Sequence, residues 1–402
     1  MMSNTLLSNI EMAPKDPILG ITEAFNADKN PNKVNLGVGV YTDENGKVPL
    51  LECVKQAESL INNKQMPRGY LPIDGLALYN KEVQGLVFGK ESSALKDERV
   101  VSAQALGGTG GLKLGADFLK RFHGNAQVLI SDPSWENHRA LFETAGFTVN
   151  TYPYYDAQTH GVNFSGMIEK LNQSPTGTII VLHACCHNPS GVDLNDEQWI
   201  QIIKTVKERN LVPFLDLAYQ GFSRSIEEDG KVIKLFVESG ITTFVSNSFS
   251  KSFSLYGERI GAFHIACQSK DEASRVLSQL KRVIRTNYSN PPAHGAQIVA
   301  TVLSTPDLRA LWEKELGHMR DRIKEMRTLF VSRLKEKLPQ QDFSFVADQN
   351  GMFSFSGLTK EQVHAMRDNY SVYAVDSGRI CVAALNNGNI DAVVNAIVGV
   401  LK

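Results

Sequence analysis

Short apolar runs alternate with segments of helical periodicity through the middle of the chain. Four runs predict strands, at residues 127–131, 178–183, 211–216 and 241–246. The segment between the second and third runs places apolar residues three and four positions apart, as one face of a helix does. Strands that alternate with helices favour a mainly parallel sheet covered by helices. The predicted fold class is therefore α/β.

A long amphipathic helix is predicted over residues 307–338. Its apolar residues, from Leu308 to Leu334, recur at alternating steps of three and four. A helix of this length often bridges two domains, so we place a boundary near residue 319. Beyond it, the sequence predicts a small α+β unit, with strands on either side of a shorter helix.

Chemically distinctive side chains follow each of the four predicted strands. Ligands of open α/β sheets bind beyond the carboxyl ends of the strands, so these positions are informative. Taken singly, each residue has an ordinary alternative: packing for the tryptophan, a turn for the asparagine, a helix N-cap for the aspartate. Together, at one edge of one sheet, they predict a ligand site. They are Trp135, His138, Asn188, Asp216, Tyr219 and Lys251.

The segment after the fourth strand has the composition of a covalent attachment point beside a phosphate clamp. Lys251 lies among the hydroxyls of Ser248 and Ser250, and Arg259 follows eight positions later. A lysine amine condenses with an aldehyde cofactor, while hydroxyls and a guanidinium hold a phosphate. The alternative is a solvated loop whose charges have no specific role.

A glycine-rich turn at residues 107–111 opens a predicted helix. Free backbone N–H groups at such a helix start attract anions. The spacing is not G-x-G-x-x-G, so the turn suits a single phosphate, held at Gly108 and Thr109, better than a dinucleotide.

Two further loops contain candidate contacts. Gly39 interrupts a strand-like run at 34–41, where it marks a bulge, a close backbone approach or a simply irregular strand. Tyr70 stands in a turn-rich loop at 68–75, and such loops commonly contact a partner or a ligand.

Two arginines near the C-terminal part complete the candidate set. Arg285 opens a predicted loop that extends to residue 292. Arg379 lies in a predicted strand at 378–382, where burying an unpaired arginine would be costly.

The composition excludes several classes of function. The chain has 402 residues, a formal net charge of -1 and no long basic run, so neither nucleic acid nor an anionic membrane is expected as a partner. No segment has about 18 consecutive apolar residues. The five cysteines lack C-x-x-C spacing, and His138, His183 and His187 lack a third ligand at metal spacing, so no disulfide or metal is expected. We expect a cytoplasmic enzyme with a small-molecule substrate.

Set side by side, these segments resemble the class I aminotransferases of fold type I, specifically the bacterial aspartate and aromatic amino acid aminotransferases. The resemblance extends from Asp16 to Arg379. It implies a large domain at residues 49–318 that binds pyridoxal phosphate, and a small domain built from residues 1–48 and 319–402. The motifs that carry it are Cys185-Cys186-His187-Asn188-Pro189, Asp216-x-x-Tyr219, Ser248-x-Ser250-Lys251 with Arg259, and Asn287-Tyr288-Ser289-Asn290-Pro291-Pro292.

The resemblance implies that pyridoxal phosphate forms a Schiff base with Lys251, which later acts as the base at the substrate Cα. Asp216 would pair with the pyridine nitrogen, supported by His138. Tyr219 and Asn188 would hydrogen-bond the phenolic oxygen of the cofactor. Trp135 would stack on its ring.

The remaining roles are also implied by the resemblance. A homodimer is expected, with Tyr70 reaching the cofactor phosphate and Arg285 a substrate side-chain carboxylate, both from the second subunit. Arg379 would bind the α-carboxylate bidentately, and Gly39 would contact the substrate. The phosphate would be held by Arg259, Ser248, Ser250, Gly108 and Thr109.

The expected reaction moves the amino group of tyrosine, phenylalanine or tryptophan to 2-oxoglutarate, with aspartate also accepted. Residues 132–138 and 245–259 look closer to the aromatic branch, whereas Thr109 and Asn290 look like the aspartate branch. An aspartate aminotransferase is therefore the alternative. A nicotinamide oxidoreductase would need the missing dinucleotide motif. A regulatory module that binds pyridoxal phosphate would need a basic nucleic-acid-binding domain.

Overall fold

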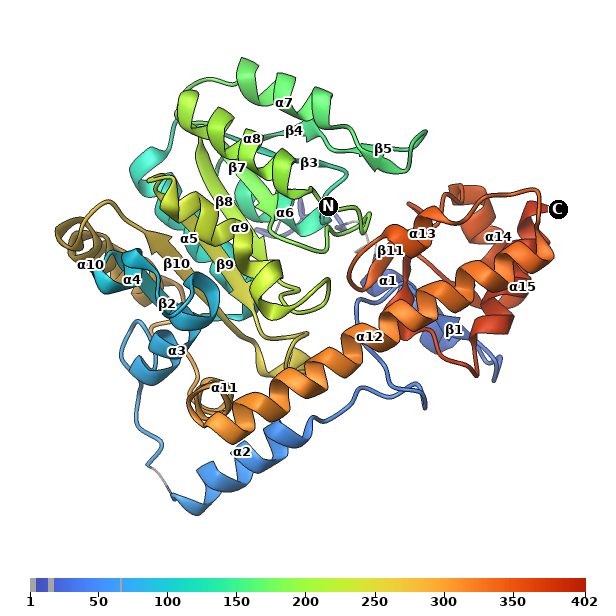
Figure 1. Cartoon of the computed structure of the whole chain (residues 1–402), viewed down its shortest axis with the longest axis horizontal. Helices are drawn as coiled ribbons and strands as arrows, with labels where there is room; N and C mark the ends of the chain where they lie inside the picture. The colour runs from blue at the N-terminus through green and yellow to red at the C-terminus, as the bar shows by residue number, and fades with distance from the viewer. Residues whose placement is uncertain (1–4, 14–17, 66) are drawn as a thin grey trace.

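A seven-stranded sheet forms the centre of the larger part of the molecule (Figure 1). The computed structural model describes residues 5–13, 18–65 and 67–402. Strand β10 is antiparallel to both of its neighbours, and the other pairs are parallel. The prediction of a mainly parallel α/β sheet is confirmed, and the four predicted strands are among its members. In spatial order these are β2 (Val100–Leu106), β10 (Ile260–Ala266), β9 (Thr243–Ser248), β8 (Val212–Leu217), β7 (Ile179–His183), β3 (Gln127–Asp132) and β4 (Thr148–Pro153).

Helices cover both faces of the sheet because its strands are apolar on both sides. In β7, Ile179 belongs to the core on one face and Ile180 to the core on the other. One face is covered by α5 (Gly107–His123), α6 (Glu136–Thr144) and α10 (Lys270–Asn287). The other is covered by α3 (Ala77–Phe88), α7 (Phe164–Gln173), α8 (Asp196–Glu208) and α9 (Ile226–Glu238), with α2 (Glu52–Asn63) and α11 (His294–Ser304) beside α3. Short elements complete this part: α4 (Ser93–Lys96), β5 (Tyr155–Asp156), β6 (Gly161–Val162) and the 3₁₀ turn η1 (Tyr256–Glu258).

A single long helix, α12 (Pro306–Lys337), runs from the sheet-containing part to the smaller part (Figure 1). Its buried side chains up to Ile323 pack in the core beside the sheet, and those from Met326 onward pack in a separate, smaller core. The helix predicted over 307–338 is confirmed. The predicted boundary near residue 319 falls inside it, and the division into domains remains a prediction.

The smaller part combines segments from both ends of the chain. Strand β1 pairs in parallel with β12, and β11 pairs antiparallel with β13, so residues more than 300 positions apart form one α+β unit. None of the helices in the described ranges has the length and apolar character that crossing a membrane requires. The elements of this part are α1 (Leu19–Ala27), β1 (Val34–Asn35), α13 (Phe345–Asp348), β11 (Phe353–Phe355), α14 (Lys360–Tyr370), β12 (Val372–Tyr373), β13 (Arg379–Cys381), η2 (Val382–Ala384) and α15 (Ile390–Leu401).

The strand-like run predicted at 34–41 is a strand only in its first two residues. After them, the N–H of Gly37 donates to Asn35 Oδ1 (2.9 Å), and the carbonyl of Gly37 accepts from the guanidinium of Arg379 (2.6 Å). Side chains therefore bind the N–H and the carbonyl of Gly37, which a strand would pair with its neighbour. The β pairing with β12 ends at Asn35.

The loop predicted from Arg285 begins three residues later than expected. Residues 285–287 form the last turn of α10, which ends where the N–H of Tyr288 donates to the carbonyl of Ile284. Asp16, where the family resemblance begins, lies outside the described residues.

Candidate active site

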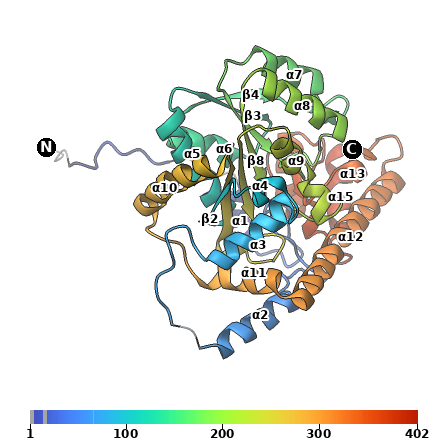
Figure 2. The ribbon, with the colours of Figure 1, turned by 60° about the vertical axis from the view of Figure 1, so that its left-hand side comes forward.

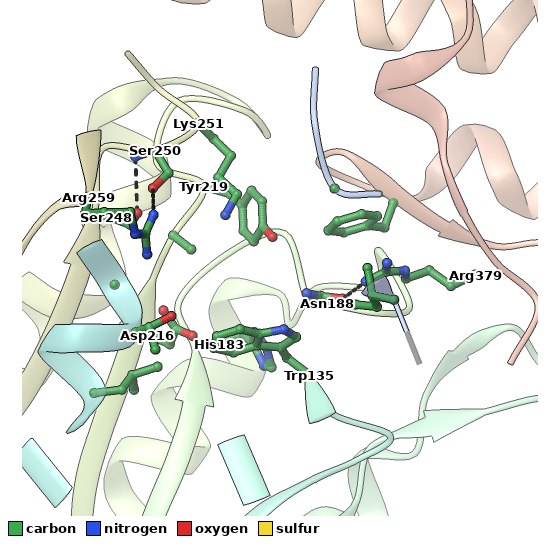
Figure 3. Close-up of a pocket in the computed structure, with 17 residues that line it drawn as sticks. Trp135, His183, Asn188, Asp216, Tyr219, Ser248, Ser250, Lys251, Arg259 and Arg379 are labelled. Atoms are coloured by element: carbon green, nitrogen blue, oxygen red, sulfur yellow. Dashed lines mark hydrogen bonds between the residues drawn. The ribbon is translucent and has the colours of Figure 1, made fainter. Parts of the chain in front are cut away.

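The loops that follow β3, β7, β8 and β9 open into one cavity of about 190 Å³ (Figure 3). Its walls combine acid, amide, phenol, lysine and arginine groups from distant parts of the chain. The sequence-predicted convergence at this edge of the sheet is therefore observed. The predicted residues that line the cavity are Gly39, Gly108, Thr109, Trp135, Asn188, Asp216, Tyr219, Ser248, Ser250, Lys251, Arg259 and Arg379.

Three candidate residues do not line the cavity. His138 lies behind Asp216, as the sequence prediction placed it. Tyr70 is 97% exposed, and Arg285 is exposed near the end of α10. Their predicted contact with the site therefore requires a second copy of the chain.

Asp216 provides a buried carboxylate at the end of β8. His138 Nε2 donates to Asp216 Oδ2 (2.8 Å), and Ser134 Oγ lies 3.0 Å from the other ring nitrogen of His138. Burial raises the pKa of Asp216, but the hydrogen bond and charge of His138, with the charge of Lys251, outweigh burial and lower the pKa. Asp216 is thus a carboxylate inside the strand, and the helix N-cap alternative is wrong.

His183 is a cavity residue that the sequence did not identify. It is the register neighbour of Asp216 in the sheet, and neither ring nitrogen has a hydrogen-bond partner among the described residues. Burial, with the nearby charge of His138, lowers the pKa of His183 to about 3, so the ring is neutral. Ligand-type atoms of His138, His183 and Asp216 lie within 4.8 Å of one another. The histidines lack a third ligand at metal spacing in the sequence, and Asp216 joins them only in the folded chain; that no metal binds here stays a prediction.

Lys251 extends its amine into the cavity beside Tyr219 (Figure 3). Its Nζ lies 5.4 Å from the centroid of the Tyr219 ring and makes no hydrogen bond or ion pair with the described residues. Burial lowers the pKa of Lys251 to about 8; the charges of Arg259 and Arg379 act in the same direction, and Asp216 opposes them. Roughly a tenth of the amine is therefore neutral at pH 7, far more than for an ordinary lysine.

This lowered pKa predicts the pH dependence of Lys251 reactivity. In the cofactor-free protein, labelling of Lys251 by an amine-directed reagent should rise with pH around a midpoint near 8, because only the neutral amine is nucleophilic. The measurement is mass spectrometry of the Lys251 peptide after short exposure at each pH. Arg259→Gln should move the midpoint upward, since it removes a positive charge. A midpoint of about 10 or above, the range of an unperturbed lysine, would refute this prediction.

One end of the cavity forms a cradle for an anion. Arg259 Nη1 donates to Ser250 Oγ (3.4 Å) and to the carbonyl of Tyr256 (2.9 Å). A Cβ atom on Gly107, where α5 begins with φ +70°, would lie 2.6 Å from Arg259 Nη2. Only glycine at this position lets the Arg259 guanidinium approach the start of α5 so closely. The guanidinium and the helix N-terminus both attract an anion such as a phosphate.

The opposite end is built around Arg379. Its side chain is buried, donating from Nη1 to Asn188 Oδ1 (3.0 Å) and from Nη2 to the carbonyl of Gly37 (2.6 Å), while Nε has no partner among the described residues. The Phe353 ring lies 4.3 Å from the guanidinium carbon. A guanidinium with donor capacity to spare at a cavity wall can bind a carboxylate.

Phe353 was missed because a phenylalanine in a short strand predicts ordinary core packing. A Cβ atom on Gly39 would lie 2.6 Å from Phe353 Cζ. A close backbone approach was one of the explanations predicted for Gly39, and it is observed. The approach is to the Phe353 ring, which leaves no room for a side chain at residue 39.

Comparison with known proteins identifies the family. Residues 31–397 match the sequence model of the class I and II aminotransferases. The chain belongs to this family. It is 59% identical to an aspartate aminotransferase of Pseudomonas aeruginosa, over 99% of this chain and 100% of that protein. The aminotransferase family predicted from the motifs is confirmed.

Two solved structures are similar to this aminotransferase over nearly all of both chains. An aromatic-amino-acid aminotransferase from Burkholderia pseudomallei, covalently bound to pyridoxal phosphate, has 62% identity and a TM-score of 0.97, with 99% of this chain and 100% of that chain covered. A psychrophilic aromatic amino acid aminotransferase from Psychrobacter sp. B6, cocrystallised with aspartic acid, has 46% identity and a TM-score of 0.97 with the same coverage. The cofactor is pyridoxal phosphate, as predicted.

The residues of this aminotransferase fit that cofactor. The unpartnered Lys251 amine stands near one wall, the Asp216 carboxylate faces the same cavity, and Arg259 with the start of α5 offers a phosphate cradle. Pyridoxal phosphate requires three such groups: a reactive amine, an anionic partner for its ring nitrogen and a site for its phosphate.

Proposed function

We propose that this aminotransferase moves the amino group of tyrosine, phenylalanine or tryptophan to 2-oxoglutarate and also accepts aspartate. The observation that carries the proposal is the composition of the cavity wall around Arg379. The rings of Trp135 and Phe353 line the same cavity as Arg379, and the Phe353 ring lies 4.3 Å from the Arg379 guanidinium carbon. Such a wall suits an α-carboxylate together with an aromatic side chain.

The proposed roles of the residues follow from their positions. When bound, pyridoxal phosphate supplies an aldehyde for the amino group and a ring that withdraws electrons from the substrate Cα. Asp216 would keep a ring nitrogen protonated, because its lowered pKa makes it a stable anion. Lys251, whose lowered pKa makes the neutral amine accessible, would take the proton from the substrate Cα.

The other proposed roles concern binding and orientation. Tyr219 and Asn188 would donate hydrogen bonds to the ring oxygen, and Trp135 would stack on the ring. Arg379 would hold the α-carboxylate and so fix the Cα–H bond relative to Lys251. Phosphate contacts are assigned to Arg259, Ser248, Ser250, Gly108 and Thr109.

We also propose that the enzyme is a homodimer whose sites use Tyr70 and Arg285 of the second copy. Apart from Tyr70, the described N-terminal residues support association, since Leu6 and Met12 are each 96% exposed. These residues extend away from the body of the molecule (Figure 2). Large apolar side chains in a projecting segment are typical of a surface that another chain covers.

Kinetics with four donors, aspartate, phenylalanine, tyrosine and tryptophan, test the substrate assignment. With 2-oxoglutarate as acceptor, kcat/KM should be higher for phenylalanine and tyrosine than for aspartate, and aspartate should remain a measurable substrate. The alternative is an aspartate aminotransferase, which the 59% identity to the Pseudomonas aeruginosa enzyme favours. Equal or higher efficiency with aspartate would establish that alternative.

A further inference from the structure

Arg327 is a fully buried arginine on α12, outside the cavity. It is 2% exposed and forms no ion pair with a carboxylate among the described residues. Burial lowers the pKa of Arg327 to about 10, which still leaves it charged at neutral pH. Burying a charged group without an opposite charge is costly, so its surroundings must compensate through hydrogen bonds.

All of the recorded hydrogen bonds from this guanidinium go to one short segment, residues 346–354. Nη1 donates to the carbonyl of Val346 (3.0 Å) and to Ser354 Oγ, and Nη2 donates to the carbonyls of Gly351 (2.8 Å) and Phe353 (2.7 Å). The planar Arg327 guanidinium therefore fixes the path of residues 346–354 against α12.

The segment that Arg327 fixes contributes a wall of the cavity. Phe353 is 3% exposed, and its ring lies 4.3 Å from the Arg379 guanidinium carbon and 6.0 Å from the Tyr219 ring centroid. The same ring nearly touches Gly39. A displacement of Phe353 would therefore change the packing of Arg379, the proposed carboxylate site.

The segment also contacts the loop that carries Asn188. The N–H of Asn350 donates to the carbonyl of Gly191 (2.6 Å), and a Cβ atom on Gly351 would lie 2.4 Å from the Cβ of Cys186. Asn188 in turn accepts a hydrogen bond from Arg379. Two of the three contacts of the Arg379 guanidinium among the described residues, the Phe353 ring and the Asn188 amide, thus depend on where this segment lies; the third is the carbonyl of Gly37.

We propose that Arg327 is a positioning residue that holds residues 346–354 so that Phe353 and Asn188 keep Arg379 oriented for a substrate carboxylate. This inference rests on the proposed role of Arg379. It gives α12 a part in substrate binding although none of its residues lines the cavity.

The test compares Arg327→Met and Arg327→Lys in the holoenzyme, with Arg333→Met as the control: Arg333 is a partly exposed arginine of the same helix that ion-pairs with Glu336 and Asp391 and does not line the cavity. The measurements are Tm, the cofactor absorption band, kcat and KM for phenylalanine, and the Kd of 3-phenylpropionate, a carboxylic acid without an amino group. Arg327→Met should keep the cofactor band but raise KM and Kd on the order of 10- to 100-fold, with a smaller effect on kcat. The KM and Kd of Arg327→Lys should lie between those of Arg327→Met and those of the unaltered enzyme. Arg333→Met should have the KM and Kd of the unaltered enzyme.

A lower Tm with unchanged KM and Kd would show a purely structural role and overturn the inference. If Arg327→Met yields no folded holoenzyme, Ser354→Ala tests the inference instead. This variant removes only one of the hydrogen-bond acceptors of Arg327. Ser354→Ala should raise KM and Kd by a smaller factor, and unchanged values would overturn the inference.

A double-mutant cycle separates this inference from the proposed function. In an Arg379→Leu background, Arg327→Met should raise KM by less than about threefold, because the residue through which it acts is gone. Fully additive losses would overturn the inference and leave the role of Arg379 standing. An unchanged KM in Arg379→Leu alone would overturn both.

Discussion

Replacing Lys251 with alanine should lower the rate of transamination by on the order of 10⁴-fold or more. Lys251 is the amine at the cavity wall beside Tyr219, and alanine can neither attach the cofactor nor move a proton. Cofactor affinity should be retained in part, because the contacts proposed for Arg259 and Asp216 remain. The measurements are steady-state kcat and cofactor content after dialysis.

Lys204→Ala is the matched control for this experiment, since Lys204 is a lysine whose side chain is 71% exposed on α8. It should retain full activity. If Lys251→Ala still transaminates at a rate comparable to the unaltered enzyme, Lys251 is not the catalytic base.

Arg285→Ala should reduce kcat/KM for aspartate and 2-oxoglutarate by on the order of 10²- to 10³-fold, the cost of leaving a bound carboxylate without its charged partner. The half-reaction with phenylalanine should change by less than about tenfold, because its side chain has no charge to pair. Arg275→Ala, also on α10 and 71% exposed, serves as the control. Equal losses for aspartate and phenylalanine would mean that Arg285 does not bind the side-chain carboxylate.

Mixing two inactive variants tests whether Arg285 acts across a dimer. After refolding together, Lys251→Ala and Arg285→Ala chains should form hybrids in which one site has both native residues. Activity with aspartate should therefore reappear at up to roughly one quarter of the native level, since half of the dimers are hybrids and each has one intact site. No recovery in a mixture proven to contain hybrids would place both residues in the same chain's site.

The predictable part of the site follows from the parallel arrangement of the strands. Once strands alternate with helices, their carboxyl ends lie at one edge, so residues such as Asn188, Asp216 and Lys251 come together whatever their separation in sequence. The length of α12 was equally predictable, because its apolar positions recur at helical spacing over many turns.

The rest of the site depends on contacts that local pattern does not encode. Phe353 looks like a core residue, and only the fold places its ring against Arg379 and Gly39. His183 reads as one more residue of a buried strand until its register with Asp216 is known. The predicted strand after Asn35 failed in part for the same reason, because the guanidinium of Arg379, distant in sequence, binds the carbonyl of Gly37.

Borohydride reduction of the holoenzyme, followed by mass spectrometry of its peptides, tests the central claim most directly. Reduction makes the bond between the cofactor and its lysine permanent, so the modified residue can be identified. We expect the mass of the reduced cofactor on the peptide that contains Lys251 and on no other lysine. A cofactor fixed to a different lysine would contradict the assignment of this cavity as the catalytic site.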